Sequence, residues 1–192
     1  MSMKNPQSVL AHLILCGTSG WALKTTGTSY PWALGTFALL FGHGAVGMVR
    51  YGLENPDEKI VKAFDTSLVT AESIALPLVN VDVYLENNMR KEIAYAHAAS
   101  AAVPVGMQVA SENNDRVIDL IVLGNIASLV FVAVSKEHAW AAGLAAVTTM
   151  NHFMLTRISE NLDVSRADLI AIGLSLFNIF AVQCLAEIDK AP

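Results

Sequence analysis

The chain alternates between long apolar stretches and short polar breaks. Each stretch has roughly 16 to 19 residues, close to the ~20 that an α-helix needs to cross a bilayer. The stretches are apolar on most faces and contain few β-branched runs, which favours buried or lipid-facing helices over strands. Their residue ranges are 8–23, 31–49, 67–85, 93–110, 117–134, 139–155 and 169–185. We therefore predict an all-α fold: an integral membrane bundle of seven transmembrane helices, or six, with short loops.

The polar breaks read as turns between helices. Residues 54–57 (Glu-Asn-Pro-Asp) combine a stop signal with a helix restart, and residues 25–29 lead into Pro31 at the first turn of the next stretch. The longest break, 50–66, is too short for a folded domain of its own. Residues 1–192 are therefore expected to form a single transmembrane helical domain without an extramembrane domain.

Composition supports the membrane class and removes others. Hydrophobic residues make up 54% of the chain and charged residues 15%, against about 25% in ordinary soluble domains. The mean hydropathy is +0.47. The net charge of −5 leaves no basic patch for a phosphate backbone, so nucleic acid is excluded as a partner. The expected partners are the lipid bilayer and other membrane subunits or a second copy of the chain.

The distribution of basic residues indicates only weakly which side of the membrane the N-terminus faces. With seven crossings, seven basic residues lie on the side of the N-terminus and five on the other, so the positive-inside rule places the N-terminus in the cytoplasm by a small margin. The first group is Lys4, Arg50, Lys59, Lys62, Arg116, Arg157 and Arg166; the second is Lys24, Arg90, Lys91, Lys136 and Lys190. Residues 189–192 match no retrieval motif, and the sequence indicates no particular organelle.

A stripe of small residues marks the fourth stretch. Alanine or glycine recurs every four residues, at Ala94, Ala98, Ala102, Gly106 and Ala110. Small side chains let helix backbones approach closely in lipid, where no hydrophobic force drives helices together. Gly143 with Ala139, and Ala142 with Ala146, repeat this spacing in the sixth stretch. We therefore predict that the fourth and sixth helices pack tightly inside the bundle.

Five ionisable residues inside the apolar stretches form the candidate polar site. Charged or titratable groups at membrane depth are rare and mark ion paths, proton relays or ligand sites. The predicted topology brings all five toward one membrane face; they are His12, His43, Glu72, Asp119 and His152. Glu72 is the most deeply placed carboxylate. The alternative is a structural or interfacial role, because histidines near helix ends often hydrogen-bond a neighbouring backbone.

No catalytic motif accompanies these residues. The chain lacks Walker, HExxH, GxSxG and CxxC patterns, so no catalytic residue, metal site or cofactor is predicted. The first functional hypothesis is a packing or interaction subunit of a membrane. The second is a small channel or carrier for protons, ions or a polar solute that uses Glu72 and the histidines. The third is an intramembrane enzyme that acts on lipid with histidine and glutamate as acid–base groups.

Overall fold

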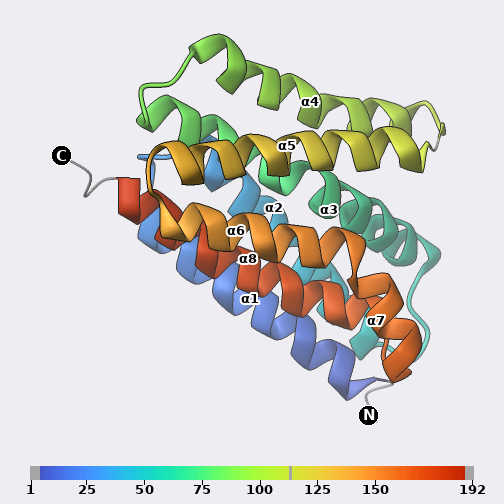
Figure 1. Cartoon of the computed structure of the whole chain (residues 1–192). Helices are drawn as coiled ribbons and strands as arrows, with labels where there is room; N and C mark the ends of the chain where they lie inside the picture. Colours follow the sequence, from blue (N-terminus) through green and yellow to red (C-terminus); the bar gives the residue numbers. More distant parts are fainter. Residues whose placement is uncertain (1–4, 113, 189–192) are drawn as a thin grey trace.

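The structure, a computed structural model, describes residues 5–112 and 114–188 and folds them into eight α-helices (Figure 1). Seven long helices correspond to the seven apolar stretches, and one short helix, α7, is additional. Their bounds are α1 Pro6–Thr26, α2 Pro31–Gly52, α3 Glu58–Glu86, α4 Lys91–Val109, α5 Asp115–Ser135, α6 Ala139–Phe153, α7 Leu155–Leu162 and α8 Arg166–Ile188. The all-α prediction is confirmed for this part of the chain.

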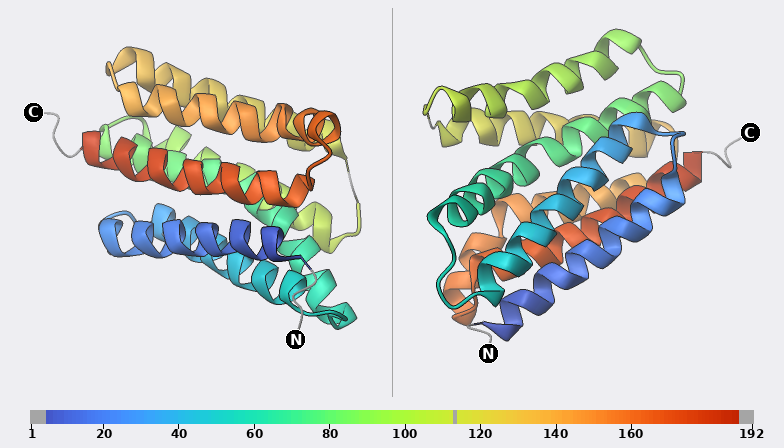
Figure 2. Two further views of the ribbon diagram at one scale, coloured as in Figure 1. Left: turned by 90° about the horizontal axis from the view of Figure 1, so that it is seen from below. Right: turned by 180° about the vertical axis from the view of Figure 1, so that it is seen from behind.

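The long helices run alternately up and down a common direction, so the bundle has two ends (Figures 1 and 2). We call the end where α1 begins the proximal end and the opposite end the distal end. Helices α3 and α8 lie at the centre: α3 packs against α2, α4, α5 and α8, and α8 packs against α1, α6 and α7 as well. The proximal end therefore collects the starts of α1, α3, α5 and α8 and the ends of α2, α4 and α6.

Residues in the polar breaks begin the helices. Asn5, Asp57 and Asn114 each accept a hydrogen bond from a backbone N–H in the first turn of the helix that follows. These contacts satisfy donors that would otherwise lack a partner at a helix start. The restart predicted at residues 54–57 is confirmed, since α3 begins directly after Asp57.

The distal start of α2 is capped by a residue from another helix. Asp82 of α3 is 2% exposed, and its Oδ2 accepts the backbone N–H of Ala33 at 2.7 Å. A carboxylate is a favourable partner for the N-terminus of a helix, where free N–H groups and the helix dipole attract negative charge. Asp82 therefore links α3 to the start of α2.

Two boundaries differ from the sequence prediction. Helix α3 begins at Glu58, so most of the predicted 50–66 loop is helical; its first turns are polar and exposed, and hydropathy does not detect them. The sixth stretch, expected to run to residue 155, ends as α6 at Phe153. Helix α7 follows with a pattern of one apolar and one polar face, too short to register as an apolar stretch.

Helix α4 is peripheral, which corrects the prediction that it is an inner helix. It packs mainly on α3, with a smaller contact on α5 (Figure 1). Positions four residues apart turn by ~400° on a helix, so an exact four-residue stripe drifts ~40° per step away from a fixed contact face. Accordingly Ala94 is buried and Ala98 half-buried, but Ala102, Gly106 and Ala110 are exposed. The buried face consists of Ala94, His97, Ala101 and Pro104.

A polar network holds α4 against α3 and α5. His97 Nδ1 donates to Asn125 Oδ1 at 2.7 Å, and His97 Nε2 accepts from Ser128 Oγ at 3.0 Å. Ser128 in turn contacts the Tyr84 hydroxyl, and the Asn80 amide donates to the Asn125 carbonyl at 2.9 Å. Both ring nitrogens of His97 have partners, so this histidine is structural.

The sixth helix, by contrast, does pack inside. It lies between α5 and α8, and a Cβ placed on Gly143 would come within 2.4 Å of the Phe180 ring. The missing side chain lets Phe180 of α8 press against the α6 backbone. The small-residue argument therefore holds at Gly143 but not at Ala139, Ala142 and Ala146, which are exposed.

Within the described ranges, four helices are long and apolar enough to cross a membrane: α2, α3, α5 and α8. This number suggests association with a membrane. It is smaller than the seven crossings predicted from the sequence, because α1, α4 and α6 are shorter or less apolar.

Candidate functional site

The five predicted polar residues lie toward the proximal end but form two separate clusters. His12 of α1 and His43 of α2 lie together, with ring centroids 5.7 Å apart, and we call them the imidazole pair. Glu72 of α3, Asp119 of α5 and His152 of α6 line a common cavity, which we call the basin. Of the residues in the channel hypothesis, Glu72 and His152 thus share one site, whereas His43 belongs to the other cluster.

The basin is a cavity of about 420 Å³ among α3, α5, α6, α7 and the start of α8. Acidic groups dominate its lining, with one guanidinium and one imidazole. Its main polar residues are Glu72, Asp115, Asp119, His152, Thr156 and Arg166. The side chains of Asp119 and Arg166 are 54% and 46% exposed, so the basin reaches the proximal surface.

Glu72 is held by Arg166 from the first turn of α8. Arg166 Nη2 donates to Glu72 Oε1 at 2.9 Å and to Oε2 at 3.2 Å, and its Nε donates to Thr156 Oγ1 at 3.1 Å. The Glu72 side chain is only 16% exposed, so this pairing compensates a largely buried carboxylate. The ion pair forms the wall of the basin between α3 and α8.

His152 and Asp119 form the second polar pair of the basin. His152 Nε2 donates to Asp119 Oδ1 at 2.8 Å. The imidazole is 14% exposed, whereas the carboxylate faces the surface. A proton or cation that enters the basin therefore meets a carboxylate oxygen and an imidazole ring side by side.

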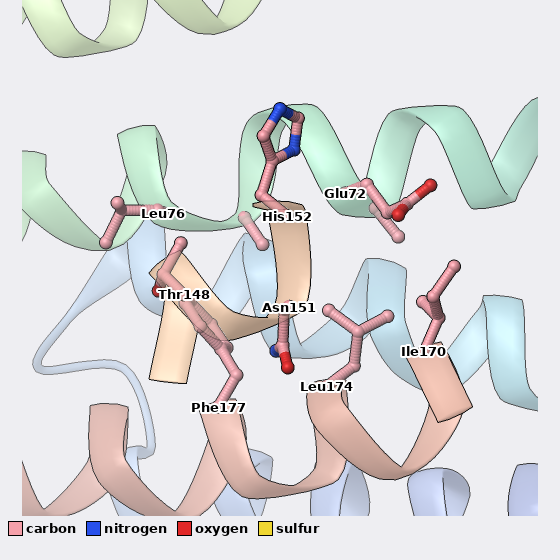
Figure 3. Close-up of a pocket in the computed structure, with 10 residues that line it drawn as sticks. Glu72, Leu76, Thr148, Asn151, His152, Ile170, Leu174 and Phe177 are labelled. Atoms are coloured by element: carbon pink, nitrogen blue, oxygen red, sulfur yellow. The ribbon is translucent and has the colours of Figure 1, made fainter. Parts of the chain in front are cut away.

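A small cavity continues inward from the basin between α3, α6 and α8 (Figure 3). Its volume of about 20 Å³ is enough for a single water molecule. Figure 3 shows the Asn151 amide directed toward α8, where a Cβ on Gly173 would lie 2.2 Å from Asn151 Oδ1. That oxygen is buried without a hydrogen-bond partner in the described structure.

The imidazole pair depends on glycines of α2. A Cβ on Gly47 would lie 2.0 Å from His12 Cδ2, and one on Gly44 would lie 2.8 Å from Cys16 Sγ. The absence of side chains at these two glycines lets α1 and α2 approach closely. The ring of Phe64 closes the pair from α3, with its centroid 4.9 Å from that of His43.

Sequence reasoning missed Arg166 and Asp168, which join the two clusters to α8. Arg166 was counted only among the basic residues that give the orientation, and no role was predicted for Asp168. Side chains two positions apart on a helix point ~200° apart, so one turn can serve both sides. Arg166 pairs with Glu72, while Asp168 accepts a hydrogen bond from the Ser8 hydroxyl of α1 at 2.9 Å. The sequence signal for these contacts was the pair of opposite charges directly before an apolar helix.

Within residues 5–112 and 114–188, no three His, Cys, Asp or Glu side chains gather in a way that could hold a metal ion. Cys16 and Cys184 are both free and buried. The candidate chemistry of the site therefore consists of ion pairs, imidazoles and hydrogen bonds.

The chain belongs to the family described as "Domain of unknown function (DUF4791)", which matches residues 28–185. That range covers every lining residue of the basin, together with His43, and leaves His12 outside. No curated protein and no solved structure matches the chain.

Proposed function

We propose that this protein is a multi-pass membrane protein whose seven long helices all cross the bilayer. Six of them contain a stretch free of Asp, Glu, Lys and Arg that is ~22 to ~28 Å long at 1.5 Å per residue, somewhat short of the ~30 Å of a hydrocarbon core. The exception is α3, where Glu72 is paired with Arg166 and Asp82 caps α2. Charges elsewhere gather at the two ends.

The outer surface between those ends supports the same proposal. Large apolar side chains in the middle of α1, α2 and α5 are more than 40% exposed, among them Leu13, Phe41, Leu123 and Phe131. Soluble monomers rarely expose contiguous apolar surface of this kind. In a bilayer these side chains would face lipid.

Cysteine accessibility distinguishes seven crossings from four. Single cysteines at Arg90, Glu112, Lys136 and Glu160, in a chain without Cys16 and Cys184, would be labelled with a membrane-impermeant maleimide. Seven crossings put positions 90 and 112 on opposite sides, and likewise 136 and 160. Crossing by only α2, α3, α5 and α8 puts each of these two pairs on one side. We expect opposite sides, with positions 112 and 160 in the cytoplasm.

Within such a bundle, the geometry best supports a pathway for protons or a small cation that begins at the basin. The observation that carries this proposal is the cavity lined by Glu72, Asp119 and His152, which opens at the proximal surface. Its acidic lining favours cations, and its imidazole is a side chain that can both donate and accept a proton. Arg166 would have to release Glu72 for a cation to bind that carboxylate.

Flux into sealed vesicles tests this proposal. The purified protein is reconstituted in vesicles that contain a pH-sensitive dye, with a sodium-sensitive dye in parallel, and a potassium gradient with valinomycin sets the potential. We expect faster flux than in empty vesicles, and Glu72→Gln should return it to the empty-vesicle rate. Glu86→Gln, on the same helix but exposed at the distal end, is the matched control and should leave the flux unchanged. Wild-type flux no faster than empty vesicles with either dye would refute the pathway.

A second candidate is a packing or interaction subunit, and the position of α4 favours it. The outer face of α4 combines exposed Tyr95, Val103 and Val109 with exposed Ala102 and Gly106. Small residues between large ones are typical of helix–helix interfaces in membranes. Such a face would suit a second copy of the chain or another membrane subunit.

Disulfide cross-linking in native membranes tests that candidate. In the background without Cys16 and Cys184, Ala102→Cys should yield a covalent dimer upon oxidation if α4 meets α4 of a second copy. Leu123→Cys, at an exposed apolar position of α5, is the control and should remain monomeric. Equal cross-linking of both variants would indicate random collision and remove the support for self-association.

A further inference from the structure

The imidazole pair is deeply buried between α1, α2 and α3. His12 is 0% exposed and His43 is 1% exposed. Their rings meet edge to face, with Phe64 against both and Tyr51 against His12. Two titratable side chains are thus enclosed by apolar and aromatic groups, away from the basin.

Hydrogen bonds fix which nitrogen of each ring carries its hydrogen. His12 Nδ1 lies 2.8 Å from the Ser8 carbonyl oxygen, which can only accept, so Nδ1 is the donor. His43 Nδ1 lies 2.8 Å from Ser67 Oγ, and the Ser67 hydroxyl donates its own hydrogen to the Phe64 carbonyl at 2.9 Å. His43 Nδ1 is therefore also a donor.

Both Nε2 atoms are consequently left as hydrogen-bond acceptors. Each is buried and has no hydrogen-bond partner in the part of the chain that the structure describes. A buried acceptor without a donor destabilises the fold. Two such acceptors at adjoining rings are open to a donor that the described residues do not supply.

The space around His12 restricts what that donor can be. A Cβ on Gly47 would lie only 2.6 Å from His12 Nε2, so the α2 backbone covers that edge of the ring. Neither histidine lines the basin or the cavity of about 390 Å³ beside Tyr51. A proton needs no cavity, because it becomes part of the ring that binds it.

The charges around the pair limit it to a single proton. Asp168 of α8 faces α1, where its Oδ2 accepts from Ser8, while its Oδ1 is buried without a partner and can balance a positive ring. Arg50 of α2 is paired with Asp65 of α3 and stacks over Phe64. Two protons would place two positive rings side by side in a buried site, which like-charge repulsion opposes.

We propose that His12 and His43 form a buried proton-binding site that takes up one proton per chain. The route to the proximal surface passes Tyr51, whose ring centroid is 5.3 Å from that of His12 and which lines the neighbouring cavity together with Asn5 and Arg50. The site shares no residue with the basin. It stands whether or not the basin conducts ions.

Nitrogen-15 NMR of histidine-labelled protein in detergent micelles tests the site directly. At about pH 8, the His12 and His43 rings should show a protonated Nδ1 and an unprotonated Nε2. On acidification to about pH 4, the two rings should together take up about one proton, with their signals moving in concert. In His43→Gln, His12 should titrate alone. His97 in the same sample, with both nitrogens hydrogen-bonded, serves as the internal reference.

Three results would overturn the proposal: a protonated Nε2 on either ring at about pH 8, uptake of two protons by the pair, or no uptake over the whole range. Ser67→Ala covers the case in which a histidine variant fails to fold. It removes the acceptor for His43 Nδ1, so the His43 ring should show a mixture of tautomers while the pair still takes up one proton. A His43 ring that stays purely Nδ1-protonated in this variant would refute the tautomer argument.

Discussion

Replacing Gly47 by alanine is expected to destabilise the bundle, because the new methyl group would enter the space of the His12 ring. The added Cβ would lie 2.0 Å from His12 Cδ2 and 2.5 Å from Cγ. The ring cannot move toward solvent, since it is fully buried and enclosed by His43, Tyr51 and Phe64. Overpacking of this kind costs about 1–3 kcal/mol.

Gly42→Ala, in the same helix, provides the matched control. No atom lies within 4 Å of a Cβ at that position. Both substitutions gain the same helix propensity, up to about 1 kcal/mol, so the difference between their free energies of unfolding isolates the contact with His12. We expect Gly47→Ala to be less stable than Gly42→Ala by about 1–3 kcal/mol.

The assay is unfolding in mixed micelles with increasing sodium dodecyl sulfate, followed by far-ultraviolet circular dichroism. The double variant His12→Ala/Gly47→Ala completes a mutant cycle, and its second substitution should be tolerated because the ring is gone. Equal stability of the two glycine variants, or an unchanged penalty without His12, would refute the packing of α1 on α2 described above.

Three further predictions use the same assay. Arg166→Ala should destabilise the protein more than Arg166→Ala combined with Glu72→Gln, because only the single variant leaves a buried carboxylate unpaired; the opposite order would contradict the role of the ion pair. His97→Leu should cost about 1–3 kcal/mol, since it removes the hydrogen bonds of the ring to buried Asn125 and half-buried Ser128, and should raise hydrogen exchange in α4 first. Asp82→Ala should cost about 1–2 kcal/mol and increase exchange at the backbone amide of Ala33, whereas Glu86→Ala should change neither.

Hydropathy was sufficient to locate the seven long helices, because apolar residues occupy most of the length of each helix, on its exposed side as well as on its buried side. It could not locate α7 or the first turns of α3, where local capping and amphipathicity decide the structure. Asp57 is the signal that marks the start of α3, and it was recognised as part of a restart. Repetition at four residues was a poor guide to the contact face of α4, since Ala102 and Gly106 have turned away from α3.

The candidate site was predictable only in part. Alternating helix directions placed His12, His43, Glu72 and His152 toward one end, as depth along each helix indicated. Which of them meet depends on which helices are neighbours, and a single sequence does not encode that in its hydropathy. The role of Arg166 could not be foreseen for the same reason, because its partner Glu72 lies on a helix far away in the chain.

Helix α3 sets the distance between two contacts that lie toward opposite ends of the molecule. Glu72 pairs with Arg166, and Asp82 caps the start of α2 ~15 Å further along the helix axis. One residue inserted between Glu72 and Asp82 would shift one contact by 1.5 Å and rotate it by ~100° relative to the other, so both could not form at once. One residue added in the 53–57 connection would leave both intact. The length of this part of α3 is therefore constrained more tightly than its composition, and insertions or deletions should be confined to the connections between helices.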